Sequence, residues 1–569
     1  GQIVFLYFLQ KKGWFGVEKE KRWGTGPKDF IRRLFNKEFG GYENFYNDIL
    51  EPLFYEALRT DRSADDHYYS RFNCKIPFLN GGLFDPQNNF DWVDIDILLP
   101  NELFSNTNKT KEGDIGDGIL DVFDRYNFTV NEEEPLEKEV ALDPELLGKI
   151  YEKLNAIRPD NFDEYVKVLK PGKKGEETKF NKEYGVYYTP REIVHYMCQE
   201  SLIEYLCSAG ISTCAKKDVE EFVRYADLIP EHERTAFEKK EKIERGVQKE
   251  TKYEHKIPES IIQNAELIDK LLADIKVCDP AVGSGAFPIG MMHEITKLRQ
   301  LLSIYLAKPI NIYDLKRNCI ENSLYGVDID PGSVEICKLR FWLSMIVDEE
   351  NFYNIKPLPN LDYKVVCGDS LLGVEKDLFN IEAFSSLEGL KPLYFKETRP
   401  GEKQKYKSQI DGLIKKISKG YTQFDFEVYF SEVFHQKGGF DIVIANPPYG
   451  GKYLDEYISY FKEHYYCTGN KNLKGSLDTF VLFIEKGYSI LRIDGNLIFI
   501  VPISVISSDS VQALHTLLEK TCKIIKVSSY AVRPKPVFES AVVNTSIISF
   551  IKTMSPVSMI LCSKMYRKD

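Results

Sequence analysis

The sequence predicts an α/β protein in which a parallel sheet covered by helices follows a mainly helical N-terminal domain. From about residue 275 onward, short β-branched runs alternate with amphipathic helical segments, which is the pattern of a parallel sheet with crossover helices. Before about residue 170, apolar side chains recur at helical spacing and turn clusters interrupt them. The expected strands are residues 275–278, 324–327, 363–367, 440–445 and 497–501.

The change of pattern places a domain boundary in a loop rich in lysine and glycine. Residues 1–175 are the expected helical domain, and residues 176–569 are the expected sheet domain. Two charged insertions interrupt the sheet domain, at about 215–260 and 375–437. We expect solvated helices with intrahelical ion pairs in the first, and a charged helix near residues 404–419 in the second.

The composition excludes several classes of protein. With 43% apolar residues the chain builds sizeable cores, which excludes wholesale disorder. The longest apolar runs are well short of the roughly 20 residues that a membrane helix needs, so we expect a cytoplasmic protein with no membrane partner. The 11 cysteines form no CxxC pair and the 8 histidines no metal-binding spacing, which predicts reduced, mostly buried thiols and no metal site.

The net charge gives a weaker argument about partners. A formal charge of −11 argues against a partner as anionic as nucleic acid. From residue 446 to the C-terminus, however, 15 Lys and Arg stand against 10 Asp and Glu. The distribution of charge therefore leaves a nucleic-acid partner open.

Residues 276–290 read as a strand, a glycine turn and the start of a helix. In a doubly wound sheet this first turn lies at the carboxyl edge of the strands, where cofactors bind. Gly283 and Gly285 allow a sharp turn and a close approach to a ligand, and Asp279 suits acceptance from a cationic amine. A dinucleotide fingerprint needs a third glycine where Pro288 stands, which disfavours a dehydrogenase. A cofactor with an ammonium group and no pyrophosphate, such as S-adenosylmethionine, fits better.

Two further expected strands also end in an acidic residue. Asp328 is placed to accept from both hydroxyls of a ribose. Asp330, which precedes Pro331, is more simply a helix N-cap. Asp369 suits acceptance from the exocyclic amine of adenine. Three consecutive strands that each end in Asp at one edge predict a nucleoside pocket.

The strongest signal is Asn446-Pro447-Pro448-Tyr449, which follows the buried strand 440–445. The two prolines fix the backbone between an amide and an aromatic ring. The Asn446 side-chain oxygen and the Pro447 carbonyl oxygen can both accept from one planar amino group, which makes that amine nucleophilic, while the Tyr449 ring stacks on the attached base. A strand followed by a proline turn accounts for Pro-Pro alone, but not for its combination with the glycine turn.

With these motifs the chain resembles the N6-adenine DNA methyltransferases of the gamma arrangement. The resemblance implies a Rossmann-like sheet that binds S-adenosylmethionine, and site-specific methylation of a flipped adenine in double-stranded DNA as the modification part of a restriction-modification system. It assigns catalysis to Asn446, Pro447, Pro448 and Tyr449. It assigns cofactor binding to Tyr188, Thr189, Pro190, Asp279, Pro280, Ala281, Gly283, Gly285, Asp328, Ile329 and Asp369.

The resemblance continues outside the core of the sheet. Residues 187–190 resemble the opening cofactor motif of the family, and they also predict a helix start with Thr189 as N-cap, Pro190 at the first position and Glu192 completing a capping box. Residues 537–548 resemble the loop and strand whose aromatic ring stacks on the flipped base, and this role falls to Phe538.

The N-terminal part resembles the connector of single-chain type IIG restriction-modification enzymes, through residues 8–14 and 75–84. Those enzymes place a nuclease domain before the connector and a target-recognition domain after the methyltransferase. We expect neither domain in this chain, since Glu18-Lys-Glu-Lys21 lacks the preceding Asp of a nuclease motif and few residues follow Lys552.

Other functions stay open at this point. Asn-Pro-Pro-Tyr also serves methyltransferases that act on protein glutamine or on guanine amines in RNA. A non-catalytic DNA-binding or assembly subunit is a further alternative, although the intact motif residues argue against it. Methylation of the cytosine ring is disfavoured because it needs a nucleophilic cysteine, normally after a proline, and no cysteine here follows one.

Overall fold

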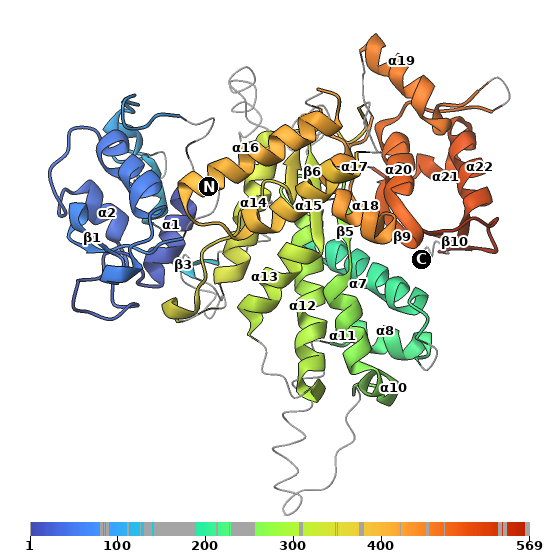
Figure 1. The fold of residues 1–569 in the computed structure, drawn as a ribbon, viewed down its shortest axis with the longest axis horizontal. Coiled ribbons are helices and arrows are strands. Elements are labelled where there is room, and N and C mark those ends of the chain that lie inside the picture. The colour runs from blue at the N-terminus through green and yellow to red at the C-terminus, as the bar shows by residue number, and fades with distance from the viewer. Residues whose placement is uncertain are drawn as a thin grey trace, which may run out of the picture. The chain divides into compact units, whose positions relative to one another are not determined.

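The chain forms two compact units in a computed structural model (Figure 1). Unit 1 comprises Gly1–Leu147, Lys338–Tyr363 and Leu378–Ile417, and unit 2 comprises Gly148–Cys337, Lys364–Asp377 and Ser418–Asp569. The structure describes residues 2–79, 84, 86, 90–110, 113–125, 127–129, 139–141, 189–211, 214–226, 228, 256–306, 311–347, 349, 351–374, 380–420, 423–450, 454–470, 473–532, 537–538 and 543–563.

The described part of unit 2 contains an eight-stranded sheet with the order β12-β10-β11-β9-β8-β5-β6-β7 (Figure 1). The strands from β7 to β9 in this order are parallel, β11 is antiparallel to both of its neighbours, and β12 is parallel to β10. All expected strands are present, and the predicted fold class is confirmed. The strands are β5 (Val277–Asp279), β6 (Leu324–Asp328), β7 (Val365–Cys367), β8 (Phe440–Ala445), β9 (Leu491–Pro502), β10 (Cys522–Tyr530), β11 (Thr545–Lys552) and β12 (Met559–Cys562).

The strand order reverses between β5 and β8, which is where the site forms. The chain runs from β5 outward to β6 and β7, and then returns to the other side of β5 with β8. The crossover connections on the two sides of such a point diverge, which opens a crevice at the carboxyl ends of the strands. Asp279 at the end of β5 and Asn446 just after β8 therefore lie at this crevice.

Both faces of β8 are buried, because helices cover the sheet on each side. Val443 and Ala445 belong to one core cluster with residues of α20. Successive side chains of a strand point to opposite faces, so Ile442 and Ile444, both fully buried, face the other layer, on which α7 packs. The helices of this unit are α7 (Arg191–Ser208), α8 (Lys216–Arg224), α10 (Glu259–Gln263), α11 (Ala265–Asp274), α12 (Ala286–Leu306), α13 (Ile312–Asn322), α14 (Pro331–Ile346, which begins here), α17 (Phe426–Tyr429), α18 (Ser431–Lys437), α19 (Asp455–His464), α20 (Thr479–Ile490), α21 (Ser504–Ser507) and α22 (Gln512–Thr521).

Unit 1 is mainly helical and includes the helices of the second charged insertion. A half-buried acid, Asp362, ties these helices to residues 338–363, since it accepts from the Tyr394 hydroxyl of one helix and pairs with Lys407 of the other at 3.7 Å. Lys338 and Lys407 hold the pKa of Asp362 well below its ordinary value. The charged helix expected near residues 404–419 is confirmed as α16. Elements of this unit are α1 (Gln2–Lys11), α2 (Phe30–Phe35), α3 (Ile119–Phe123), α15 (Ile381–Lys396), α16 (Pro400–Ile417), and the strand pairs β1 (Tyr68–Tyr69) with β2 (Cys74–Lys75) and β3 (Asn127–Thr129) with β4 (Glu139–Ala141).

Several expectations about the chain as a whole have simple outcomes. The boundary near residue 175 and residues 229–255 of the first insertion lie outside the described residues. All 11 cysteines are free and 7 of them are buried, as predicted. Within the part of the chain that the structure describes, no helix is both long and apolar enough to cross a membrane.

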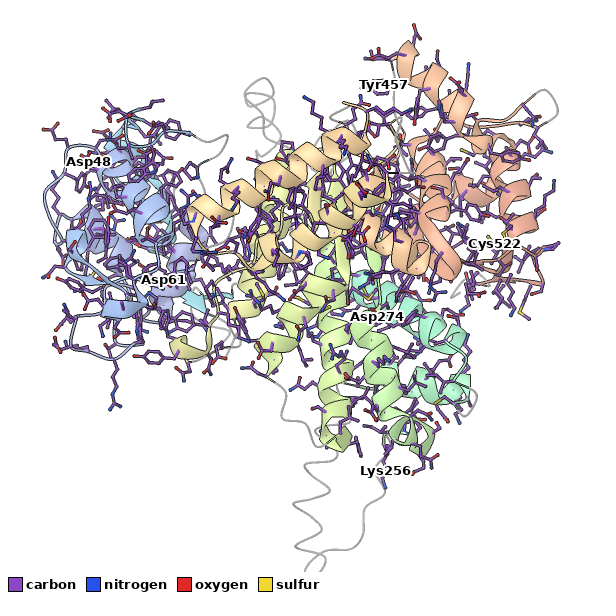
Figure 2. The ribbon with its side chains drawn as sticks, in the orientation of Figure 1. Asp48, Asp61, Lys256, Asp274, Tyr457 and Cys522 are labelled. Atoms are coloured by element: carbon purple, nitrogen blue, oxygen red, sulfur yellow. The ribbon has the colours of Figure 1, made fainter. Side chains whose placement is uncertain are left out.

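Glu51 in unit 1 is a buried carboxyl group that none of the described residues hydrogen-bonds. It lies between two π-helical turns, Tyr46–Leu50 and Leu53–Ala57, the first of which carries Asp48 (Figure 2). The residue is 0% exposed, and neither carboxyl oxygen accepts a hydrogen bond among the described residues. Burial, with a smaller contribution from Asp96, raises the pKa of Glu51 to about 7. Ionising this group therefore costs the folded state free energy.

We expect Glu51 to lower stability as the pH rises from its ordinary pKa of 4.5 to about 7, because over this window the unfolded chain is ionised while the folded protein must hold a proton. Glu51→Gln should raise the free energy of unfolding by roughly 2 kcal/mol at pH 8 and leave it nearly unchanged at pH 4.5. Urea unfolding at the two pH values measures this difference. Glu43→Gln changes an exposed acid of the same unit and should show no gain at either pH; an equal gain from both variants would contradict this account.

Candidate active site

The glycine turn after β5 is bound to the end of β6. Gly283 and Gly285 have φ angles of +50° and +88°, so the turn uses the left-handed conformations that the sequence predicted for them. The Gly283 amide donates to Asp328 Oδ2 at 2.8 Å, and the Ala281 amide donates to Asp279 Oδ1 at 3.0 Å. The turn therefore holds both carboxylates beside its own backbone.

The end of β6 leads directly into α14. Asp328 Oδ1 accepts from the Asp330 amide at 2.9 Å. Asp330 in turn accepts from the Ser333 amide at 3.0 Å and from the Ser333 hydroxyl at 2.7 Å, and α14 begins at Pro331. The prediction that Asp330 is an N-cap followed by proline is confirmed, so Asp328 is the acid at this edge left for a ligand.

The electrostatics of this edge favour a cationic ligand. Burial raises the pKa of Asp279 well above its ordinary value, and the charge of Asp328 raises it further. Burial also raises the pKa of Asp328. Two carboxyl groups that resist ionisation at close range are stabilised in their charged form by a cation between or beside them.

The end of β7 completes the row of acids. Asp369 Oδ1 accepts from the Leu371 amide at 2.9 Å, and the buried Ser370 hydroxyl donates to the Pro280 carbonyl at 2.6 Å. The Ser370 contact binds the loop after β7 to the loop after β5. Ile329, next to Asp328, is 71% exposed, which leaves an apolar side chain at the crevice for a flat ring.

Asn446 joins the β8 motif to the segment that precedes α7. Its Nδ2 donates to the Thr189 hydroxyl oxygen at 3.1 Å. Its Oδ1 accepts from the Tyr449 hydroxyl at 2.7 Å, and the same hydroxyl lies 3.0 Å from the Ile500 carbonyl oxygen. Thr189 and Asn446, which are 257 positions apart, are thus in direct contact. Both the nitrogen and the oxygen of the Asn446 amide are hydrogen-bonded.

The predicted helix start at Thr189 is wrong. α7 begins at Arg191 with Pro190 as its N-cap, whose ψ angle of 144° is extended, and no side chain caps the helix. The physical reason is that the Thr189 hydroxyl is bonded to Asn446 instead of to the first amides of the helix. Thr189, which a rule about neighbouring residues predicted as an N-cap, therefore takes part in a contact with a distant part of the chain.

The remaining site residues have mixed outcomes. Pro447 is buried, Pro448 is exposed and Tyr449 is partly buried against the core. Phe538 is 1% exposed, so stacking on a base requires its ring to be uncovered first. Tyr188 lies outside the described residues. The stacking roles of Tyr449 and Phe538 stay predictions.

Two polar side chains at this edge were not predicted from the sequence. Ser370 is missed because nothing in its local pattern indicates a bond to Pro280, 90 positions away. Cys367 is exposed at the end of β7 and lies 3.6 Å from the Ile329 carbonyl oxygen. As for metals, no cluster of three His, Cys, Asp or Glu side chains suited to an ion occurs among the residues that the structure describes.

Comparisons with known proteins agree with this geometry. The family described as Eco57I restriction-modification methylase matches residues 322–538, which confirms the resemblance to restriction-modification methyltransferases. A putative type II restriction enzyme and methyltransferase of Methanocaldococcus jannaschii is 30% identical over 385 residues, which cover 65% of this chain and 27% of that protein. The type II restriction enzyme and methyltransferase Eco57I of Escherichia coli is 24% identical over 277 residues, which cover 45% of this chain and 22% of that protein.

The chain thus spans about a quarter of the length of these curated relatives. Among solved structures, the type IIL restriction-modification enzyme MmeI in complex with DNA matches with a TM-score of 0.51 at 12% identity, covering 100% of this chain and 55% of that one. This structural match supports the fold.

We expect Gly285→Ala to destabilise the turn, because a Cβ there lies 2.5 Å from Cys337 Sγ and the φ angle of +88° disfavours any other residue. The free energy of unfolding should fall by roughly 2–4 kcal/mol. Urea unfolding measures this loss, and adding Cys337→Ala should restore part of it. Gly401→Ala is the matched control, since its Cβ meets nothing within 4 Å. Equal effects of the two glycine substitutions would refute the steric account.

Proposed function

We propose that this chain is the methyltransferase part of a restriction-modification enzyme and that it methylates N6 of adenine in double-stranded DNA with S-adenosylmethionine. The observation that carries the proposal is the Asn446-Pro-Pro-Tyr449 motif at the end of β8, beside the glycine turn of β5 at the point where the strand order reverses. The family match and the descriptions of the two relatives support methylation and restriction-modification; adenine as the target base rests on the motif.

The residues around the turn fit the proposed cofactor group by group. Asp279 suits the ammonium group, because a cation stabilises its ionised form. Asp328 suits the ribose hydroxyls, since a carboxylate accepts from two hydroxyls at once. Asp369 suits the adenine amine, and Ile329 offers an apolar surface to the ring. When bound, S-adenosylmethionine supplies a methyl group on a positively charged sulfur, which becomes a neutral sulfide on transfer.

Asn446 has the geometry of an orienting group for the target amine. Because Thr189 accepts from Nδ2, Oδ1 is the acceptor end of the amide on the opposite side, and Tyr449 donates to it in this structure. A carbonyl oxygen has two lone pairs, so Oδ1 can accept from the target amine beside or in place of Tyr449. Together with the Pro447 carbonyl it would draw the nitrogen lone pair out of the ring system and hold it in line with the methyl group.

We expect Asn446→Ala to lower turnover by about 100-fold or more while cofactor affinity changes less than about threefold, since the amide acts on the target amine and not on the cofactor. The assay incubates the chain with labelled S-adenosylmethionine and either DNA, RNA or protein, and identifies the methylated product after digestion. N6-methyladenine from DNA alone supports the proposal. Label in protein glutamine or RNA guanine would replace it with those alternatives, and no transfer by a chain that binds cofactor would favour a non-catalytic subunit.

The affinity for the cofactor should fall as the pH falls through the raised pKa of Asp279. Below that pKa the carboxyl is protonated and no longer attracts an ammonium group, and bound cation draws the pKa back down, so binding releases a proton. Titrations of S-adenosylhomocysteine across pH should therefore show a steeper loss than titrations of methylthioadenosine, which keeps the ribose and adenine but lacks the ammonium. Parallel curves for the two ligands would show that Asp279 does not face the ammonium.

A further inference from the structure

The segment that follows β7 is held by one internal hydrogen bond and by hydrogen bonds to two other parts of the chain. Ser370 donates to the Pro280 carbonyl, as described above. The Leu371 amide donates to Asp369 Oδ1 at 2.9 Å, and the Leu371 carbonyl oxygen accepts from the Tyr465 hydroxyl at 2.5 Å. Leu371 therefore connects Tyr465 to the Asp369 carboxylate. Its carbonyl oxygen accepts from Tyr465, and its amide donates to Asp369.

Tyr465 comes from the connection between β8 and β9, after the Asn446-Pro-Pro-Tyr449 motif. It comes directly after α19 and is 7% exposed, with its ring edge-on to Phe461 at 5.6 Å between centroids. The turn after it is fixed by Glu485, whose carboxylate accepts from the Tyr466 and Cys467 amides at 2.8 and 2.7 Å. Burial raises the pKa of the Tyr465 phenol well above its ordinary value, so the hydroxyl is a donor at any working pH.

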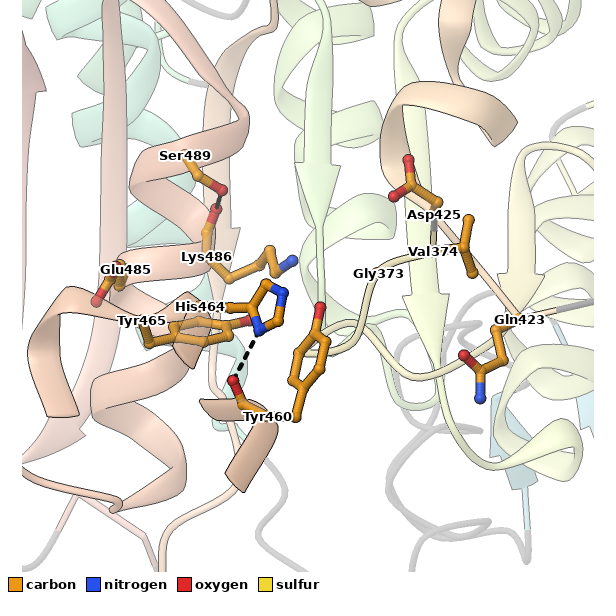
Figure 3. Close-up of a pocket in the computed structure, with 10 residues that line it drawn as sticks. All are labelled: Gly373, Val374, Gln423, Asp425, Tyr460, His464, Tyr465, Glu485, Lys486 and Ser489. Atoms are coloured by element: carbon orange, nitrogen blue, oxygen red, sulfur yellow. Dashed lines mark hydrogen bonds between the residues drawn. The ribbon is translucent and has the colours of Figure 1, made fainter. Parts of the chain in front are cut away.

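A cavity borders the C-terminal end of this segment (Figure 3). The cavity has a volume of about 590 Å³ and is lined by Gly373 and Val374 of the segment and by Asp425, Tyr460, Tyr465 and Lys486, among others. Backbone beside a cavity lacks contacting atoms on that side. Lys486 of α20 supplies one more contact, since its ammonium group donates to the Leu372 carbonyl oxygen at 3.4 Å.

We propose that Tyr465 is a positioning residue for cofactor recognition: through Leu371 it fixes the Asp369 carboxylate that accepts from the adenine amine. The inference deepens the proposed function and rests on it. Tyr465 follows the Asn446-Pro-Pro-Tyr449 motif in the chain, so this contact links the proposed target-base side of the site to the adenine end of the proposed cofactor pocket. The substitution Tyr465→Phe removes the hydroxyl alone and leaves the ring in its place.

The test compares two ligands that differ at the adenine amine. S-adenosylhomocysteine carries the amine, and S-inosylhomocysteine carries an oxygen in its place. We expect Tyr465→Phe to weaken binding of S-adenosylhomocysteine by about three- to tenfold, and binding of S-inosylhomocysteine by less than about twofold. Calorimetric titration of the full chain measures both affinities, and thermal unfolding of each variant measures stability separately.

Tyr457→Phe is the matched control, because it removes a hydroxyl from α19 that takes part in no hydrogen bond among the described residues. It should change neither affinity. Equal weakening of both ligands by Tyr465→Phe, or weakening of neither, overturns the positioning role while leaving the proposed function intact. Failure of the folded wild type to bind S-adenosylhomocysteine overturns both. If Tyr465→Phe does not fold, Ser370→Ala releases the other side of the same segment and is subject to the same comparison.

Discussion

The hydrogen bond between the Gly283 amide and the Asp328 carboxylate is the contact on which the crevice depends. It closes the glycine turn of β5 against the end of β6, so the two acids at these ends lie together in a place that burial makes unfavourable for charge. A buried carboxylate is stable only with donors or a cation beside it. The turn supplies one backbone donor to each acid, and the Asp330 amide supplies a second to Asp328.

The Asn446-Pro-Pro-Tyr449 motif depends on the same pair of strand ends, because it lies on the other side of β5. β8 lies next to β5, so the position of Asn446 relative to the turn is set by strand pairing. The amide is then oriented by Thr189 and Tyr449, one from before α7 and one from its own motif. Such fixed donors and acceptors cost little reorganisation when a substrate arrives, which is the condition for effective positioning.

Local sequence patterns predicted most of the fold, and the site residues that they indicated stay predictions. The strands were visible as β-branched runs, and the Asp330 cap and the turn at Gly283 and Gly285 follow rules that involve only neighbouring residues. Contacts between distant residues were not visible. The Thr189 hydroxyl was predicted to cap a helix, but Asn446 binds it; Tyr465 carried no signal, since its partner Leu371 lies 94 positions earlier. The nearest partner of a hydroxyl depends on the tertiary fold, which rules about neighbouring residues do not describe.

The central claim is that the acids at the carboxyl edge form a pocket for S-adenosylmethionine. Calorimetric titration of the purified chain with this ligand, for the wild type and Asp328→Ala, tests it most directly. The account predicts saturable one-to-one binding by the wild type and its loss in the variant, while thermal unfolding shows that the variant is folded. A folded wild type that gives no binding heat and no ligand-induced shift in unfolding would contradict the account.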